Sequence, residues 1–172
     1  NMAIINGTNN NDILNGTTGD DDIYGEGGND TIYSNGGRDR IYGRDGNDRI
    51  YAGGGVQALV GGNGDDIYYD VNTSSVVIYE NFGEGNDTVY SGSSTINWTL
   101  DSSPLNYPDG STQGIVWQTL NTGSQLVLYI ENLILTGSGN VSIYGNFLNN
   151  MLQGNRNDNK IWGAAGDDTL DG

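Results

Sequence analysis

The residues best suited to chemistry in this sequence are aspartates that recur every nine positions. Residues 7–69 divide without gaps into seven nine-residue units, and the sixth position is acidic in all but one of them. These sixth-position residues are Asp12, Asp21, Asp30, Asp39, Asp48, Gln57 and Asp66. Regularly spaced carboxylates in glycine-rich turns offer the oxygen ligands that hard divalent cations prefer. The pattern therefore favours cation binding.

Composition excludes several other kinds of site. The 172 residues include no cysteine and no histidine, so zinc sites built on those ligands and Ser-His or Cys-His nucleophilic centres are ruled out. The formal net charge of −16 disfavours binding to nucleic acid. No apolar run is long enough to span a membrane. Adjacent acids such as Asp65 and Asp66 could resemble a glycosidase pair, but their place in the repeat explains them better, so we expect no enzyme activity.

The same period indicates which elements position the aspartates. The eighth position is a large apolar or aromatic residue in every unit, and the fourth is glycine in every unit but the first. One inward side chain per unit cannot form a core alone, so the units must stack. A short strand around the eighth position, followed by a turn that glycine permits, gives two units per coil. The sixth-position acids then form two columns, one with Asp12, Asp30, Asp48 and Asp66, the other with Asp21 and Asp39.

Columns of carboxylates at the strand spacing of about 4.8 Å should repel one another. Lysine and arginine together number only 6, against 22 acidic residues. A divalent cation between the acids would relieve the repulsion. Calcium suits such a site better than magnesium, because magnesium demands near-octahedral geometry and retains its water. The sequence thus predicts several calcium ions.

The repeat resembles that of the RTX family, secreted proteins whose G-G-x-G-x-D-x-U-x units form a calcium-loaded parallel β-roll. The resemblance covers residues 7–69, resumes in "FGEGNDTVY" at 82–90, and returns at 145–171. It implies an all-β fold, a right-handed parallel β-roll. It also implies ions between units n and n+2, bound by sixth-position side chains and turn carbonyls. The implied metal-site residues are Asp12, Asp21, Asp30, Asp39, Asp48, Asp66, Asp87, Asp168, Gly7, Asn9, Gly16, Thr18, Gly19, Gly25, Gly27, Gly28, Gly37, Gly43, Asp45, Gly46, Gly64, Asn150 and Asn159.

Three positions depart from the family pattern. Gln57 replaces an aspartate, so the site that it shares with Asp39 should bind weakly or stay empty. Asn150 and Asn159 replace aspartates in the C-terminal units and leave Asp168 as the charged residue there. We therefore expect close stacking with few ions in the C-terminal repeats.

The period also suggests a division of the chain. Residues 1–69 form N-terminal repeats, 70–144 an irregular and wider continuation of the solenoid, and 145–172 C-terminal repeats. The central part contains strand-like segments, "VVIYEN" and "VLYIENLILTG". Between them, residues 101–125 contain both prolines and many polar residues, which predicts an inserted loop or hairpin.

Aromatic residues offer a possible partner surface. Tyrosines at the ninth position should form two outward ladders, with Tyr107 and Trp117 adding aromatic side chains in the insertion. The ladders could simply stabilise neighbouring strands, or they could bind glycans or another subunit. The ninth-position tyrosines are Tyr24, Tyr33, Tyr42, Tyr51 and Tyr69.

The resemblance implies export through a bacterial type I secretion system, and folding on extracellular calcium. The expected role is a structural or adhesive scaffold, outside the cell or on its surface. Because the first and last repeats leave strand edges open, head-to-tail assembly into a filament or surface layer is expected. The alternative is a calcium-folded accessory module, for secretion or glycan binding, within a larger secreted enzyme or toxin.

Overall fold

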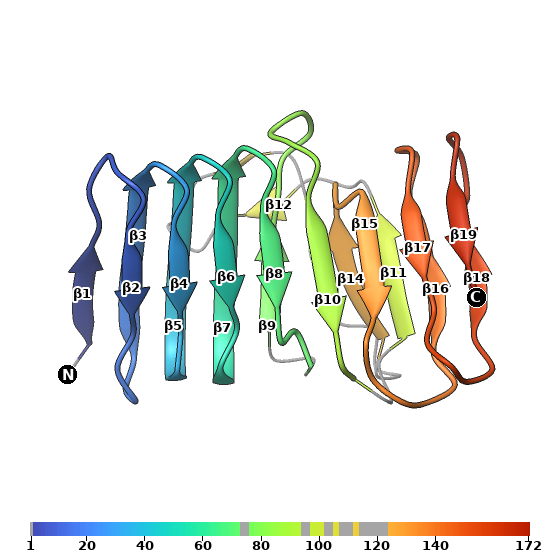
Figure 1. Cartoon of the computed structure of the whole chain (residues 1–172), viewed down its shortest axis with the longest axis horizontal. Coiled ribbons are helices and arrows are strands. Elements are labelled where there is room, and N and C mark those ends of the chain that lie inside the picture. Colours follow the sequence, from blue (N-terminus) through green and yellow to red (C-terminus); the bar gives the residue numbers. More distant parts are fainter. Residues whose placement is uncertain (1, 73–75, 94–96, 102–104, 107–111, 114–123) are drawn as a thin grey trace.

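The computed structural model describes residues 2–72, 76–93, 97–101, 105–106, 112–113 and 124–172. Short strands stack into an elongated parallel β-solenoid, with the two ends of the chain at opposite ends of its long axis (Figure 1). The described residues include no helix long and apolar enough to cross a membrane. The predicted all-β parallel fold is confirmed.

Two parallel sheets face each other along the solenoid. One sheet follows the order β1 (Ala3–Asn6), β3 (Asp21–Gly27), β5 (Gly36–Asp45), β7 (Gly54–Asn63) and β9 (Val76–Tyr79). The facing sheet contains β2 (Ile13–Asn15), β4 (Thr31–Tyr33), β6 (Arg49–Tyr51), β8 (Ile67–Tyr69), β10 (Thr88–Ser91), β15 (Asn132–Leu135), β17 (Met151–Gln153) and β19 (Thr169–Asp171).

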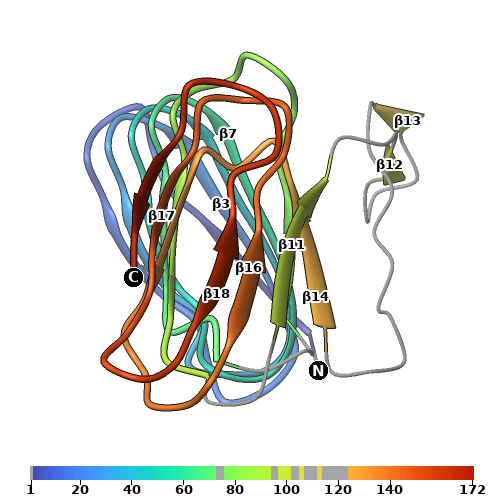
Figure 2. The same ribbon diagram turned by 90° about the vertical axis from the view of Figure 1, so that its right-hand side faces the viewer.

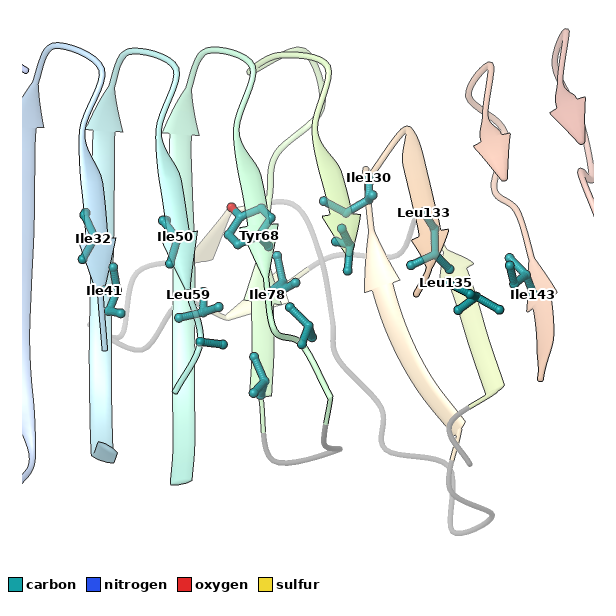
Figure 3. Packing of buried hydrophobic residues seen from close by; sticks show 14 of the residues in the cluster. Ile32, Ile41, Ile50, Leu59, Tyr68, Ile78, Ile130, Leu133, Leu135 and Ile143 are labelled. Atoms are coloured by element: carbon teal, nitrogen blue, oxygen red, sulfur yellow. The ribbon is translucent and has the colours of Figure 1, made fainter. Parts of the chain in front are cut away.

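The strand register confirms the predicted stacking of units n and n+2. Ile32 on β4 pairs with Ile50 on β6, which pairs with Tyr68 on β8. On the facing sheet, Ile41 on β5 pairs with Leu59 on β7. All five side chains are fully buried and form two facing rows inside the coils (Figure 3). Burial of each apolar side chain stabilises the fold by about 1.5–3 kcal/mol, so the core depends on the stack rather than on any one coil.

The central section changes the order of the strands. After β10 the chain forms β11 (Asn97–Asp101), and later β14 (Ser124–Leu128), which lies between β9 and β11. β14 and β11, followed by β16 (Ser142–Tyr144) and β18 (Lys160–Trp162), form a separate four-stranded parallel sheet in that order. β11 thus leaves one place in the stack beside β9, and β14 fills that place later in the chain.

The interval between β11 and β14 contains an antiparallel pair, β12 (Leu105–Asn106) and β13 (Thr112–Gln113). This pair lies to one side of the coils (Figure 2) and within the predicted insertion. Tyr107 and Trp117 fall outside the described residues. The division of the chain into three segments stays a prediction.

The two predicted tyrosine ladders are formed. Ring centroids lie 4.7 Å apart for Tyr33 and Tyr51, and 4.6 Å apart for Tyr51 and Tyr69. Tyr90, which was not included in the prediction, continues this ladder at 5.1 Å from Tyr69. Tyr24 and Tyr42 stack at 5.1 Å on the other sheet. The role of these rings as a partner surface stays a prediction.

Candidate metal centres

The sixth-position acids form a column in which each one is held by the backbone of the preceding coil. Each acid comes directly before its strand in the eight-stranded sheet. The N–H of Asp12 donates to Oδ1 of Asp30 at 2.8 Å, and the N–H of Asp30 donates to Oδ1 of Asp48 at 2.8 Å. The pattern continues from Asp48 to Asp66 at 2.7 Å and from Asp66 to Asp87 at 2.9 Å. These bonds fix each carboxylate and use only one of its two oxygens.

The second oxygen of several acids is buried and without a hydrogen-bond donor. In the described part of the chain, this is true of Oδ2 in Asp30, Asp48 and Asp66. A buried acceptor that lacks a partner costs about 1–3 kcal/mol, and more when it is charged. A cation between the coils would supply the missing partner.

A glycine lies beside each of these oxygens. A methyl group added to Gly25 would lie 2.5 Å from Asp30 Oδ2 and 2.5 Å from the Gly43 carbonyl oxygen. Gly43 is likewise crowded by Asp48 Oδ2 and by the carbonyl oxygen of Gly61. Glycine is therefore required at Gly25 and Gly43, because a carboxylate and a carbonyl from the next coil converge there. This oxygen-only donor set fits calcium.

Burial and mutual repulsion disfavour the charged form of these acids when no cation is present. Desolvation, with smaller contributions from neighbouring carboxylates, raises the pKa of Asp48 to about 6 and that of Asp66 to about 9. Desolvation also raises the pKa of Asp87 to about 8. A bound divalent cation would favour the deprotonated forms.

The second column, on the facing sheet, is satisfied by donors from the protein. The N–H of Asp21 donates to Oδ1 of Asp39 at 2.9 Å. Oδ2 of Asp39 accepts from the Ser34 hydroxyl and, at 3.5 Å, from the Gln57 amide. Oδ2 of Asp21 accepts from the backbone N–H of Thr17 at 2.6 Å. These donors leave less free oxygen for a cation, and the predicted weakness of the site at Gln57 stays a prediction.

The other predicted turn residues differ in backbone angle, packing and exposure according to their position in the nine-residue unit. From the third unit on, the fourth-position glycines have left-handed backbone angles, which a side chain rarely adopts. Gly46 and Gly64 each pack on the carbonyl of the fourth-position glycine one coil earlier. Their φ values run from +94° to +128° for Gly28, Gly37, Gly46 and Gly64. First-position glycines Gly7 and Gly16 lie against carbonyls of the next coil, those of Gly25 and Ser34. Residues in the turns that are at least partly exposed are Asn9, Thr18, Gly19, Gly27 and Asp45.

The structure adds a polar ladder at the fifth position, which the sequence prediction missed. The N–H of Asn29 donates to Oδ1 of Asn11 at 2.8 Å, and the N–H of Asn47 donates to Oδ1 of Asn29 at 2.9 Å. The N–H of Asp65 continues the ladder to Oδ1 of Asn47 at 3.0 Å. The signal was present in the sequence, because Asn precedes the sixth-position aspartate in alternate units. This ladder ties the turns together without a metal.

Glu131 is a further member of the acidic column that was missed. Its Oε2 accepts the N–H of Asp87 at 2.8 Å, and desolvation raises its pKa to about 7. Glu131 comes directly before β15, and Leu133, the second residue of that strand, is fully buried. Glu131 shares a local signal with the repeats, because it is an acid directly before a strand whose second residue points inward.

In the C-terminal coils, asparagine amides make the contacts between coils. Oδ1 of Asn150 accepts the N–H of Asn146 at 2.9 Å, while its amide donates to the Glu131 carbonyl at 3.1 Å. Asn159 repeats the arrangement, and its amide donates to the Val141 carbonyl at 3.2 Å. Asp168 Oδ1 accepts the N–H of Asn150 at 2.9 Å. The amide group provides both the acceptor and the donor here, and the metal role of the two asparagines stays a prediction.

Comparison with known proteins agrees with this geometry. A family model described as the RTX calcium-binding nonapeptide repeat matches residues 6–41, 33–68 and 144–172, which together make up more than half of the chain. A search of curated proteins finds no match. The family model covers the coils in which the acidic columns, the glycine turns and the inward apolar rows recur. The chain therefore belongs to the RTX family of calcium-binding nonapeptide-repeat proteins, and its repeats form a β-roll.

Proposed function

We propose that this chain is a calcium-triggered folding unit of a secreted protein. The observation that carries the proposal is the set of buried Oδ2 atoms of Asp30, Asp48 and Asp66, which lack hydrogen-bond donors in the described structure. Without positive charge between the coils, these acids oppose folding. With calcium between them, the same acids hold the coils together.

Backbone groups of the chain position the carboxylate of each site. The N–H of one sixth-position residue holds Oδ1 of the next, which directs Oδ2 toward the first-position glycine. That glycine keeps the space open, and the carbonyl of Gly43 or Gly61 borders it. Calcium, when bound, supplies the positive charge that neutralises neighbouring carboxylates and links adjacent coils.

The calcium level of the compartment sets when folding occurs. Extracellular calcium modules have dissociation constants of about 10⁻⁴–10⁻³ M, so such sites stay empty in the cytosol and fill outside the cell. The binding free energy then becomes folding free energy. RTX repeats are typical of type I secreted proteins, and an unfolded chain suits export through such a system.

Circular dichroism during a calcium titration tests the proposal. The purified chain in a chelator should give the spectrum of a disordered polypeptide, and calcium near the millimolar range should produce a β-sheet spectrum. Magnesium at the same concentration should have little effect, because it retains its water. A chain that stays equally ordered and heat-resistant in chelator would contradict the proposal.

The second part of the proposal is a non-catalytic scaffold role in which the ends of the roll stack on coils of similar geometry. Leu170 on β19 is 48% exposed, although its strand partner Leu152 is fully buried in the inward row. A second copy in a head-to-tail filament would cover it. Sedimentation velocity with and without calcium tests self-association. Calcium-dependent species larger than a monomer are expected, and monomers alone at high concentration would contradict it.

The stacked tyrosines favour this structural role over binding of glycans by an accessory module. The rings of Tyr33, Tyr51 and Tyr69 lie nearly parallel, with interplanar angles of 19° and 12°. Each ring therefore covers the face of its neighbour, whereas sugars bind to open ring faces. Cross-strand stacking of this kind stabilises a sheet by about 0.2–1 kcal/mol per pair.

A further inference from the structure

One glutamate lies in register with the first-position glycines Gly43 and Gly61. Tyr42 on β5 pairs with Val60 on β7, and Val60 pairs with Tyr79 on β9. The residues that follow them in the chain are Gly43, Gly61 and Glu80. Glu80 is thus located where the repeats have a first-position glycine, and it is completely buried.

A second departure from the repeat lies next to the first. The eighth position of the last N-terminal unit is Tyr68, where the earlier units have leucine or isoleucine. Tyr68 is completely buried in the inward row (Figure 3), and its hydroxyl donates to Oε1 of Glu80. The space beside Gly61 is bordered by this hydroxyl, by Glu80 Oε1 and by Asp66 Oδ2. The tyrosine thus orients the glutamate toward the acidic column.

Three carboxylates converge at this point. Asp66, Glu80 and Asp87 each place one oxygen within 4.8 Å of the others, and none of the three residues is more than 1% exposed. Oδ2 of Asp66 and Oε2 of Glu80 have no hydrogen-bond donor in the described structure. Ion pairs in the described ranges join Arg40 to Asp22 and Arg44 to Glu26, away from this cluster. Three buried acids without a compensating charge are strongly unfavourable.

We propose that Asp66, Glu80 and Asp87 form a three-carboxylate calcium site, with Tyr68 as a positioning residue for Glu80. The inference rests on the proposed calcium-dependent folding and adds a side-chain ligand from outside the nonapeptide pattern. The other sites of the column combine sixth-position aspartates with turn carbonyls. A third carboxylate strengthens the attraction for a divalent or trivalent cation, so this site fills first.

The competing interpretation is a metal-free pair in which a protonated Glu80 and Tyr68 only fill the core. Glutamine has the shape and hydrogen-bonding groups of a protonated glutamate but cannot offer a charged ligand. Glu80→Gln therefore separates the two. Glu26→Gln is the matched control, because it makes the same change at a carboxylate that pairs with Arg44 on the surface.

The experiment measures calcium binding to the whole chain by equilibrium dialysis and isothermal titration calorimetry. Glu80→Gln should lose one bound calcium per chain, or bind it ~10-fold more weakly, and the lost site should be the tightest. Glu26→Gln should match the wild type. Equal stoichiometry and affinity in Glu80→Gln would overturn the three-carboxylate site. Absence of calcium binding by the wild type would instead defeat the proposed function.

Terbium luminescence gives a second test that does not depend on Glu80→Gln folding. Tb³⁺ has the higher charge that a three-carboxylate site favours, and a nearby tyrosine sensitises its emission. With one Tb³⁺ per chain, Tyr68→Phe should keep the binding stoichiometry while losing most of the sensitised emission. Unchanged emission in this variant would place the first ion elsewhere and overturn the proposal.

Discussion

The backbone N–H of Asp30 donates to Oδ1 of Asp48, one coil away, over 2.8 Å. This bond holds the Asp48 carboxylate so that its Oδ2 stays buried without a donor in the described part of the chain. Asp48→Asn keeps the Oδ1 acceptor and removes the charge assigned to cation binding. We expect the calcium concentration at half-maximal folding to rise ~10-fold in a circular dichroism titration.

Asp65→Asn is the control for this variant. It also removes one negative charge, but from an exposed residue whose Oδ1 accepts the N–H of Asn86 at 2.9 Å. Asparagine already serves in this way at Asn47. The folding midpoint should move by less than about twofold, because exposed charges contribute little. Equal shifts in the two variants would mean that net charge, rather than ligand position, controls folding.

The metal-free chain should gain order on acidification. The pKa values of Asp48, Asp66 and Asp87 lie at about 6, 9 and 8 in the fold, above the ordinary value of 3.8. The folded state therefore binds more protons than the unfolded state between about pH 4 and pH 9, and the free energy of unfolding falls as pH rises through that window. In chelator, the β-sheet signal should be stronger near pH 5 than near pH 7.5.

Calcium should reverse the sign of this pH dependence, because its ligands must be deprotonated. With saturating calcium, acidification toward pH 4 should lower the thermal unfolding midpoint. The β-sheet circular dichroism signal in chelator and thermal melts in calcium, each followed across pH, measure the two trends. The same direction of change in the two conditions would show that these buried acids do not bind the cation.

Gly43→Ala tests the space that the repeats leave beside each carboxylate. The added methyl group would overlap Asp48 Oδ2 and lie 2.7 Å from the Gly61 carbonyl oxygen. We expect the free energy of unfolding in calcium to fall by about 1–3 kcal/mol, as in overpacked cores. Urea unfolding in calcium measures it. Gly54→Ala is the control, since a methyl group there meets no atom within 4 Å.

Constant spacing made the regular coils predictable. A nine-residue period fixes which residue lies above which, so Asp30 over Asp12 and Ile41 over Ile23 follow from counting alone. The buried row and the tyrosine ladders follow from the same count, because neighbouring positions on a strand face opposite sides. The chemistry of the acidic column was predictable because it depends on that register.

The central coils were less predictable because the spacing there is not constant. Asp87 follows Asp66 by 21 residues, and Glu131 follows Asp87 by 44. A search for a fixed period therefore stops before Glu131. Glu80 was missed for another reason: it replaces a glycine rather than an aspartate, so its role appears only when β9 is placed beside β7. The place of β14 between β9 and β11 also depends on tertiary packing rather than on local pattern.

Asn150→Asp should convert a metal-free coil into a calcium-dependent one. The Asn150 amide donates to the carbonyls of Glu131 at 3.1 Å and Ile130 at 3.3 Å, and aspartate cannot replace those donors. The new carboxylate would also add charge beside Asp168, whose Oδ1 accepts the N–H of residue 150. In calcium just sufficient to fold the wild type, we expect a loss of about 1–3 kcal/mol in the free energy of unfolding, and saturating calcium should restore most of it.

Hydrogen exchange of the β17 and β19 amides, in limiting and in saturating calcium, measures this effect in the coils that contain residue 150. Asn149→Asp is the matched control, because residue 149 is exposed and its Oδ1 accepts the N–H of Asp167 at 2.9 Å. Aspartate can make that same contact, as Asp65 does with Asn86. Protection in the control should not depend on the mutation. If saturating calcium fails to restore the protection lost in Asn150→Asp, an acid at the sixth position is not sufficient for a cation site. The carbonyls of the preceding coil would then be arranged for an amide alone.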